Sequence, residues 1–91
     1  MTAKQIIFSG KVQGVGFRYQ TKDIALGFDV VGWVKNLGDG TVELQVMGEE
    51  DEVGDFISEI TEESELAPLI KEYHSFDIPE LSHCRGFRIV S

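Results

Sequence analysis

The hydrophobic period along the chain changes between two and about 3.6 residues, and this succession restricts the fold more than any other feature. Period two, or a short run of strand-forming residues, marks four segments: residues 5–10, 30–36, 41–47 and 70–78. Helical spacing starts at Phe17 and ends near Gly27 or Asp29, and it returns from Glu49 to Ile60. Residues 61–68 then form a polar connection. The order is therefore β-α-β-β-α-β, with a possible short fifth strand over residues 86–90.

This order predicts an α+β domain of the ferredoxin-like, split βαβ type. Its sheet is expected to be antiparallel, with both helices on one face. The clearest strand is 41–47, in which Val42, Leu44 and Val46 alternate with side chains suited to the other face. Dividing 91 residues would leave halves without a core, so we expect a single domain over residues 1–91. The architecture hosts many activities, and the function has to be inferred from particular residues.

Composition excludes several classes of protein. With 42% hydrophobic and 26% charged residues, the chain has the composition of a soluble globular protein and not of a disordered one. No apolar run approaches the roughly 20 residues of a membrane span, and the first residues do not form a signal peptide. A single cysteine, Cys84, excludes an internal disulfide and a cysteine-clustered zinc site. We therefore expect a cytoplasmic protein without a membrane partner.

The charge is acidic overall and unevenly distributed. A net charge of −8 argues against binding to duplex nucleic acid, because phosphate neutralisation needs clustered Lys and Arg. Residues 1–36 nonetheless carry five basic residues against two acidic ones. Nine carboxylates and no basic group lie from Glu49 to Glu65, which we interpret as a solvated helix face that aids solubility. An anionic ligand is therefore expected to bind within the first 36 residues.

The segment most informative about chemistry is GKVQGVGFR, from Gly10 to Arg18, where a strand ends and a helix begins. Its glycines allow successive N–H groups to point into one concavity, which suits an anion. The helix start adds further unpaired N–H groups, and the Arg18 guanidinium can hold two phosphate oxygens. Two interpretations stay open on these grounds: an anion-binding cradle, or a tight strand-to-helix loop with a surface arginine.

A second informative segment is GWVKNLGDG, residues 32–40. Asn36 ends the second strand, which runs parallel to the first in a split βαβ fold, so Asn36 is expected on the same rim as Arg18. A carboxamide offers a donor and an acceptor without charge, which suits the orientation of a water molecule. The alternative is that Asn36 only shapes the turn, as asparagine often does.

Together the two segments, with Gly40, Val42 and Gly48 at the matching spacing, resemble the two signatures of the acylphosphatase family. The resemblance covers residues 4–62 by motif. It implies a small cytoplasmic hydrolase that cleaves acyl phosphates to a carboxylate and orthophosphate by water attack, without metal, cofactor or phosphoenzyme. We also expect a monomer, and inhibition by the product orthophosphate, because an amide nest with an arginine recognises the dianion and not the acyl chain.

The resemblance carries specific roles onto this chain. Arg18 completes the cradle with its side chain, and Asn36 positions the attacking water. The phosphoryl oxygens are held by the backbone amides of six consecutive residues: Gln13, Gly14, Val15, Gly16, Phe17 and Arg18.

Two other classes of function stay open. One is a non-catalytic module that binds acyl or carbamoyl phosphate, since the same domain occurs at the N-terminus of a hydrogenase-maturation carbamoyltransferase. A chain that starts at Met1 and stops just after its last strand is expected to be the free-standing enzyme instead. The other class is a ferredoxin-like interaction domain, which explains the sheet but not Arg18 and Asn36.

Overall fold

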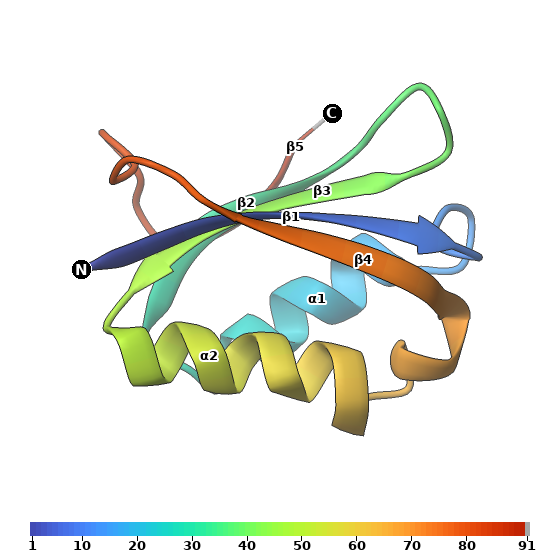
Figure 1. Cartoon of the computed structure of the whole chain (residues 1–91), viewed down its shortest axis with the longest axis horizontal. Helices are drawn as coiled ribbons and strands as arrows, with labels where there is room; N and C mark the ends of the chain where they lie inside the picture. Colours follow the sequence, from blue (N-terminus) through green and yellow to red (C-terminus); the bar gives the residue numbers. More distant parts are fainter. Residues whose placement is uncertain (91) are drawn as a thin grey trace.

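A computed structural model describes residues 1–90 (Figure 1). Its elements follow in the order β1 (Thr2–Gly10), α1 (Phe17–Ala25), β2 (Val30–Asn36), β3 (Val42–Gly48), α2 (Glu50–Ser58), the π-helical turn η1 (Glu59–Glu63), the 3₁₀ turn η2 (Ala67–Leu69), β4 (Ile70–Asp77) and β5 (Phe87–Val90). The predicted β-α-β-β-α-β order and the short fifth strand are confirmed.

The five strands form one sheet in the order β4-β1-β3-β2-β5. β1 pairs antiparallel with β3 and β4, and β2 pairs antiparallel with β3. β5 pairs parallel with β2, so the sheet is mixed and the antiparallel prediction holds for its first four strands only. Both helices lie against the same face, as the split βαβ pattern predicts (Figure 1).

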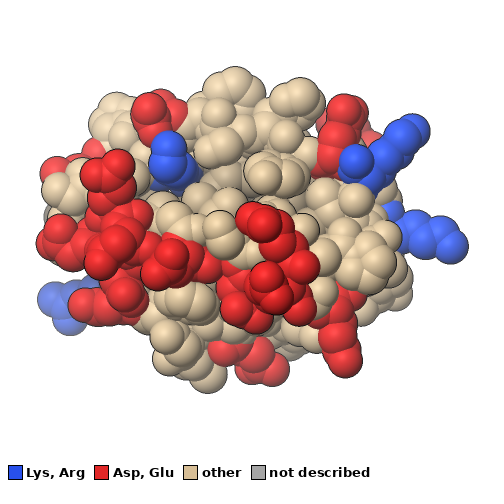
Figure 2. Space-filling view, turned by 60° about the horizontal axis from the view of Figure 1, so that its bottom comes forward, with Lys and Arg blue, Asp and Glu red and all other residues tan. Residues whose placement is uncertain are grey.

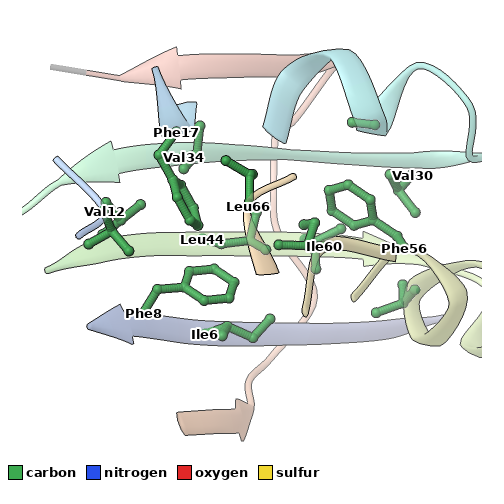
Figure 3. Packing of buried hydrophobic residues seen from close by; sticks show 14 residues of the cluster. Ile6, Phe8, Val12, Phe17, Val30, Val34, Leu44, Phe56, Ile60 and Leu66 are labelled. Carbon is green, nitrogen blue, oxygen red and sulfur yellow. The ribbon is translucent and has the colours of Figure 1, made fainter. Parts of the chain in front are cut away.

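The core fills the space between the sheet and the two helices (Figure 3). On β3, Val42, Leu44 and Val46 are fully buried, which confirms the predicted alternation. α1 begins at Phe17 as predicted, and its buried residues Phe17, Thr21 and Ala25 follow the helical period. Burial of each large apolar side chain contributes about 1.5–3 kcal/mol to the stability of the fold. The helices are therefore held chiefly by their buried apolar faces.

The second helical segment continues beyond its predicted end. The π-helical turn η1 extends it to Glu63, and Leu66 is fully buried, so the expectation of a polar connection over residues 61–68 is wrong. Thr61 and Ser64 donate their hydroxyls to the carbonyls of Ile57 and Ile60, both at 2.9 Å. These polar side chains satisfy the backbone of the terminal turns instead of forming a solvated loop.

Candidate active site

The sheet topology brings the two informative segments to one edge. β1 and β2 both run antiparallel to β3, so they point the same way and end at the same edge of the sheet. The loop of residues 11–16, which we call the cradle loop, leaves β1 there and leads into α1 (Figure 1). Asn36 ends β2 beside it, next to the turn of residues 37–41.

The last residue of β1, directly before the cradle loop, is a glycine that no other residue could replace without strain. Gly10 has φ +125°, and an added Cβ would lie 2.4 Å from the Leu69 carbonyl oxygen. The N–H of Lys11 donates to that same oxygen at 2.9 Å. The close approach of this backbone to the start of β4 fixes the direction in which the loop leaves the strand.

The second half of the cradle loop and the start of α1 have unpaired backbone N–H groups. Gly14 and Gly16 have φ +77° and +79°, in the left-handed region that favours glycine. Within residues 1–90, the N–H groups from Gly14 to Arg18 donate no hydrogen bond to another protein group, and the N–H of Gln20 makes the first helical bond, to the Gly16 carbonyl at 3.0 Å. Free amides at a helix start favour an anion.

These groups surround a cavity of about 90 Å³. It is lined by Val12, Gly14, Gly16, Phe17, Arg18, Tyr19 and Asn36. The structure thus brings Arg18 and Asn36 together, from residues that lie far apart in the sequence. Two of the residues assigned to the site by sequence do not line it: Val15, which is 45% exposed, and Gln13, which is half-buried.

The polar side chains of this cavity lack partners within the protein. Asn36 Oδ1 is buried and accepts no hydrogen bond from any group of residues 1–90. An acceptor left in this state costs about 1–3 kcal/mol. Arg18 is half-buried and makes no ion pair with a carboxylate of the described residues, although the chain carries 16 acidic side chains. The unpaired guanidinium favours an anionic ligand, whereas the unpaired Oδ1 favours a hydrogen-bond donor such as water.

The Phe17 side chain fixes the end of the cradle loop to the core. This side chain is 2% exposed, and its ring lies 5.2 Å from that of Phe8 in the core (Figure 3). The sequence analysis assigned only the Phe17 backbone amide to the site, whereas the structure shows that the ring fixes the start of α1 against β1.

Gln13 has a function that the sequence did not reveal. Its Nε2 donates to the carbonyl oxygens of Leu37 and Thr41, both at 2.8 Å. The side chain thereby ties the cradle loop to the turn that follows Asn36. The partners lie 24 and 28 residues away, and no local signal in the sequence could have identified them.

The turn after β2 is stabilised by hydrogen bonds between two of its own residues. The Asp39 carboxylate accepts hydrogen bonds from the Thr41 hydroxyl and, at 3.1 Å, from the Thr41 N–H. Both hydrogen bonds favour the charged carboxylate, the one from the Thr41 hydroxyl most, and they hold the pKa of Asp39 below its usual 3.8. Since the Thr41 carbonyl in turn accepts from Gln13, this network reaches the cradle loop.

Charge is unevenly spread over the surface. Carboxylates cover much of the helix-bearing face (Figure 2). Basic side chains project at the right-hand end, where Figure 1 places the cradle loop, and others lie at the left of the same view. The carboxylate cover fits our interpretation of the acidic segment from Glu49 to Glu65 as a solvated face.

A larger cavity, of about 360 Å³, lies at the opposite end of β1. Its lining includes Met1, Lys4, Glu50 and Asp77, and Lys4 is already paired with Asp77 at 2.7 Å. It shares no residue with the cradle loop.

Among residues 1–90, no three His, Cys, Asp or Glu side chains gather so as to hold a metal ion. No helix of that range has the length and hydropathy of a membrane span.

Fold and cavity together define a small α+β domain of the ferredoxin-like type, with a polar cavity at the ends of β1 and β2. The family model described as Acylphosphatase matches residues 4–89. The chain belongs to the acylphosphatase family.

Known proteins similar to this chain support the assignment. An acylphosphatase of Bacillus pumilus (strain SAFR-032) is 40% identical over 83 residues, which cover 91% of each chain. The crystal structure of acylphosphatase from Bacillus subtilis superposes with a TM-score of 0.89 at 33% identity, covering both chains completely. The crystal structure of full-length HypF in the phosphate- and nucleotide-bound form matches with a TM-score of 0.86 at 36% identity. That match covers 99% of this chain and 12% of HypF, so it is a likeness to one part of a larger protein.

Proposed function

We propose that the protein is an acylphosphatase, which hydrolyses the carboxyl–phosphate bond of acyl phosphates to a carboxylate and orthophosphate. The observation that carries this proposal is the cavity in which free backbone amides, the unpaired Arg18 and the buried Asn36 Oδ1 converge. These are the donors and the acceptor that water attack on a phosphoryl group requires, and the family assignment supports the same reaction.

The phosphoryl group would be bound by the cradle loop. The unpaired N–H groups from Gly14 to Arg18 would donate to its oxygens, and the Arg18 guanidinium would hold two of these oxygens in its planar fork. Charge spreads over these oxygens in the transition state of phosphoryl transfer, so fixed donors stabilise it more than the ground state. Because the carboxylate is a good leaving group, positioning and charge stabilisation suffice for much of the rate.

Asn36 would orient the attacking water. Its buried Oδ1 accepts one water hydrogen, which directs an oxygen lone pair at the phosphorus. A bond forms from the water oxygen to phosphorus as the bond from phosphorus to the acyl oxygen breaks. A phosphoryl oxygen takes the water proton, and the acyl group leaves as carboxylate.

Gln13 would act as a positioning residue. Its two hydrogen bonds, to Leu37 and Thr41, set the distance between the amides that hold phosphorus and the turn that follows Asn36. In-line attack depends on that distance, since displacement by about 1 Å can cost on the order of 10²-fold in rate.

A non-catalytic module that binds acyl or carbamoyl phosphate is not favoured. The curated relatives that match over most of the chain are named acylphosphatases, whereas HypF is matched by one part only. A binding module also gives no reason to keep the Asn36 acceptor buried and unpaired, since it costs stability.

We further propose that the chain works as one domain over residues 1–91, as a cytoplasmic monomer. Its partners would be an acyl phosphate and orthophosphate, with neither nucleic acid nor membrane. The single apolar core and the net charge of −8 support these proposals. A light-scattering mass in solution tests the monomer.

The reaction itself is tested by phosphate release from benzoyl phosphate, with and without EDTA. We expect hydrolysis that EDTA leaves unchanged and little activity on simple phosphate monoesters, whose leaving groups need a cation or an acid. Activity abolished by EDTA and restored by a divalent metal would overturn the proposed mechanism.

A further inference from the structure

The acyl half of the substrate has to lie outside the cavity described above. That cavity has about 90 Å³ and presents amides, a guanidinium and a carboxamide, which suit the phosphoryl group. The acyl carbon is one oxygen away from phosphorus, so the acyl group extends through the mouth of the cavity. This step rests on the proposed function and concerns what the mouth recognises.

Tyr19 lies at that mouth. It lines the cavity, and its side chain is 68% exposed. It is the third residue of α1, and the Cα–Cβ bonds of a helix tilt toward its N-terminus, which here is the side of the cradle loop. The Tyr19 ring therefore leans toward the cavity and not along the helix into solvent.

The Tyr19 ring is not used by the protein itself. Within residues 1–90, it stacks on no other aromatic ring and its hydroxyl makes no hydrogen bond with a side chain or the backbone. The other tyrosine, Tyr73, lies 6.1 Å from Phe8 and packs against the core. Ligand sites in proteins combine apolar or aromatic side chains with a few polar groups, as the Tyr19 ring and this polar cavity do.

Val15 adds a second apolar group at the same mouth. It lies between Gly14 and Gly16, which both line the cavity, and it is 45% exposed. The left-handed conformations of the two glycines hold this residue at the tip of the cradle loop, away from the core. Of the large hydrophobic side chains that are exposed, Tyr19 lines this cavity, and Val15 lies between two glycines that line it.

We infer that Tyr19, assisted by Val15, forms an acyl subsite that favours apolar and above all aromatic acyl groups over small ones. An aromatic acyl group can stack on the phenol ring with centroids about 4.5–7 Å apart, whereas an acetyl group offers one methyl. The ring and not the hydroxyl makes the contact, because the hydroxyl has no structural partner.

The test compares kcat/KM for benzoyl phosphate and acetyl phosphate. We expect Tyr19→Ser to lower the benzoyl-to-acetyl ratio about 3- to 10-fold relative to wild type, chiefly through KM for the aromatic substrate. Tyr19→Phe keeps the ring and is expected to keep the ratio. The matched control is Leu26→Ser: Leu26 is 78% exposed at the end of the same helix and does not line the cavity, so the ratio stays unchanged.

Inhibition by orthophosphate separates the subsite from the cradle. We expect the phosphate inhibition constant of Tyr19→Ser to equal that of wild type, because the loop amides and Arg18 bind phosphate and the Tyr19 ring does not. An unchanged substrate ratio, or an equal loss on both substrates, would overturn the inference while leaving the proposed function intact. If wild type hydrolyses neither acyl phosphate, the proposed function fails, and the inference fails with it.

Discussion

Replacement of Gln13 by alanine tests whether the cradle loop and the turn after Asn36 work as a unit. The change removes two hydrogen bonds of 2.8 Å, to the carbonyls of Leu37 and Thr41. A hydrogen bond of this kind contributes about 0.5–1.5 kcal/mol, so the link is worth about 1–3 kcal/mol. Neither carbonyl loses its only partner, because each also accepts a backbone N–H within the turn, from Gly40 or from Leu37. We therefore expect a cost of about 1–2 kcal/mol.

This loss should appear both in stability and in catalysis. In urea unfolding, Gln13→Ala is expected to lower the free energy of unfolding by about 1–2 kcal/mol with an unchanged m-value. If the link holds the attacking water in line with the cradle, kcat falls about 10-fold, since each 1.4 kcal/mol corresponds to that factor. Inhibition by phosphate needs only the cradle loop and should weaken less than kcat does.

Two further variants make the test specific. Gln13→Glu keeps the length of the side chain but cannot donate to carbonyls at neutral pH, so it should lose at least as much activity as the alanine variant. Gln20→Ala is the matched control: Gln20 is a glutamine of the same region whose exposed side chain donates to Glu65 at 3.1 Å. We expect it to keep kcat and stability within about 0.5 kcal/mol. A Gln13→Ala protein with the kcat and stability of wild type would refute the positioning role.

Four other changes probe the site and its support. Arg18→Lys should weaken phosphate inhibition about 10-fold or more, because an ammonium cannot reproduce the bidentate fork; phosphate affinity equal to wild type would contradict the cradle. Asn36→Ala should lower kcat on the order of 10²-fold with little change in KM, and its unfolding free energy should not fall, because the variant removes an unpaired buried acceptor. Gly10→Ala should destabilise the fold by about 2–4 kcal/mol in urea, from positive φ and the clash with Leu69. The Thr41 hydrogen bonds that lower the pKa of Asp39 stabilise the folded protein above pH 3.8. This contribution to stability is lost as the pH falls through the pKa that Asp39 has in the folded protein. Asp39→Asn should therefore flatten the stability profile below pH 3.8, and an unaltered profile would contradict the role of the Thr41 bonds.

The sequence predicted those parts of the fold in which one face is buried and the neighbouring residues alternate with it. β3 shows this best, because Val42, Leu44 and Val46 face the core and the residues between them do not. β4 is an edge strand that is exposed from Lys71 to Asp77, so burial imposed no alternation from which its register could be predicted. The parallel pairing of β5 with β2 depends on a tertiary contact and has no local signal.

The segment after α2 was mispredicted for a related reason. Thr61 and Ser64 have side chains typical of loops, but their hydroxyls bond back to the helix and allow it to continue. Leu66 then enters the core from a stretch that is otherwise polar. A single apolar residue has no period, and only the position of η2 against the helices shows that it is buried.

The features of the site that depend on local backbone conformation could be predicted from the sequence, whereas those that depend on contacts between distant residues could not. Glycines before a helix predict free amides because the conformation is local, and the left-handed Gly14 and Gly16 adopt it. The side-chain bonds of Gln13 and the unpaired Oδ1 of Asn36 depend instead on how the β1 and β2 ends meet. An unpaired buried acceptor opposes folding, whereas the Gln13 hydrogen bonds contribute about 1–2 kcal/mol to stability. The unpaired Oδ1 of Asn36 beside the cavity is therefore better explained by the reaction than by the stability of the fold. A loss of kcat in Asn36→Ala without a loss of stability would separate the two explanations.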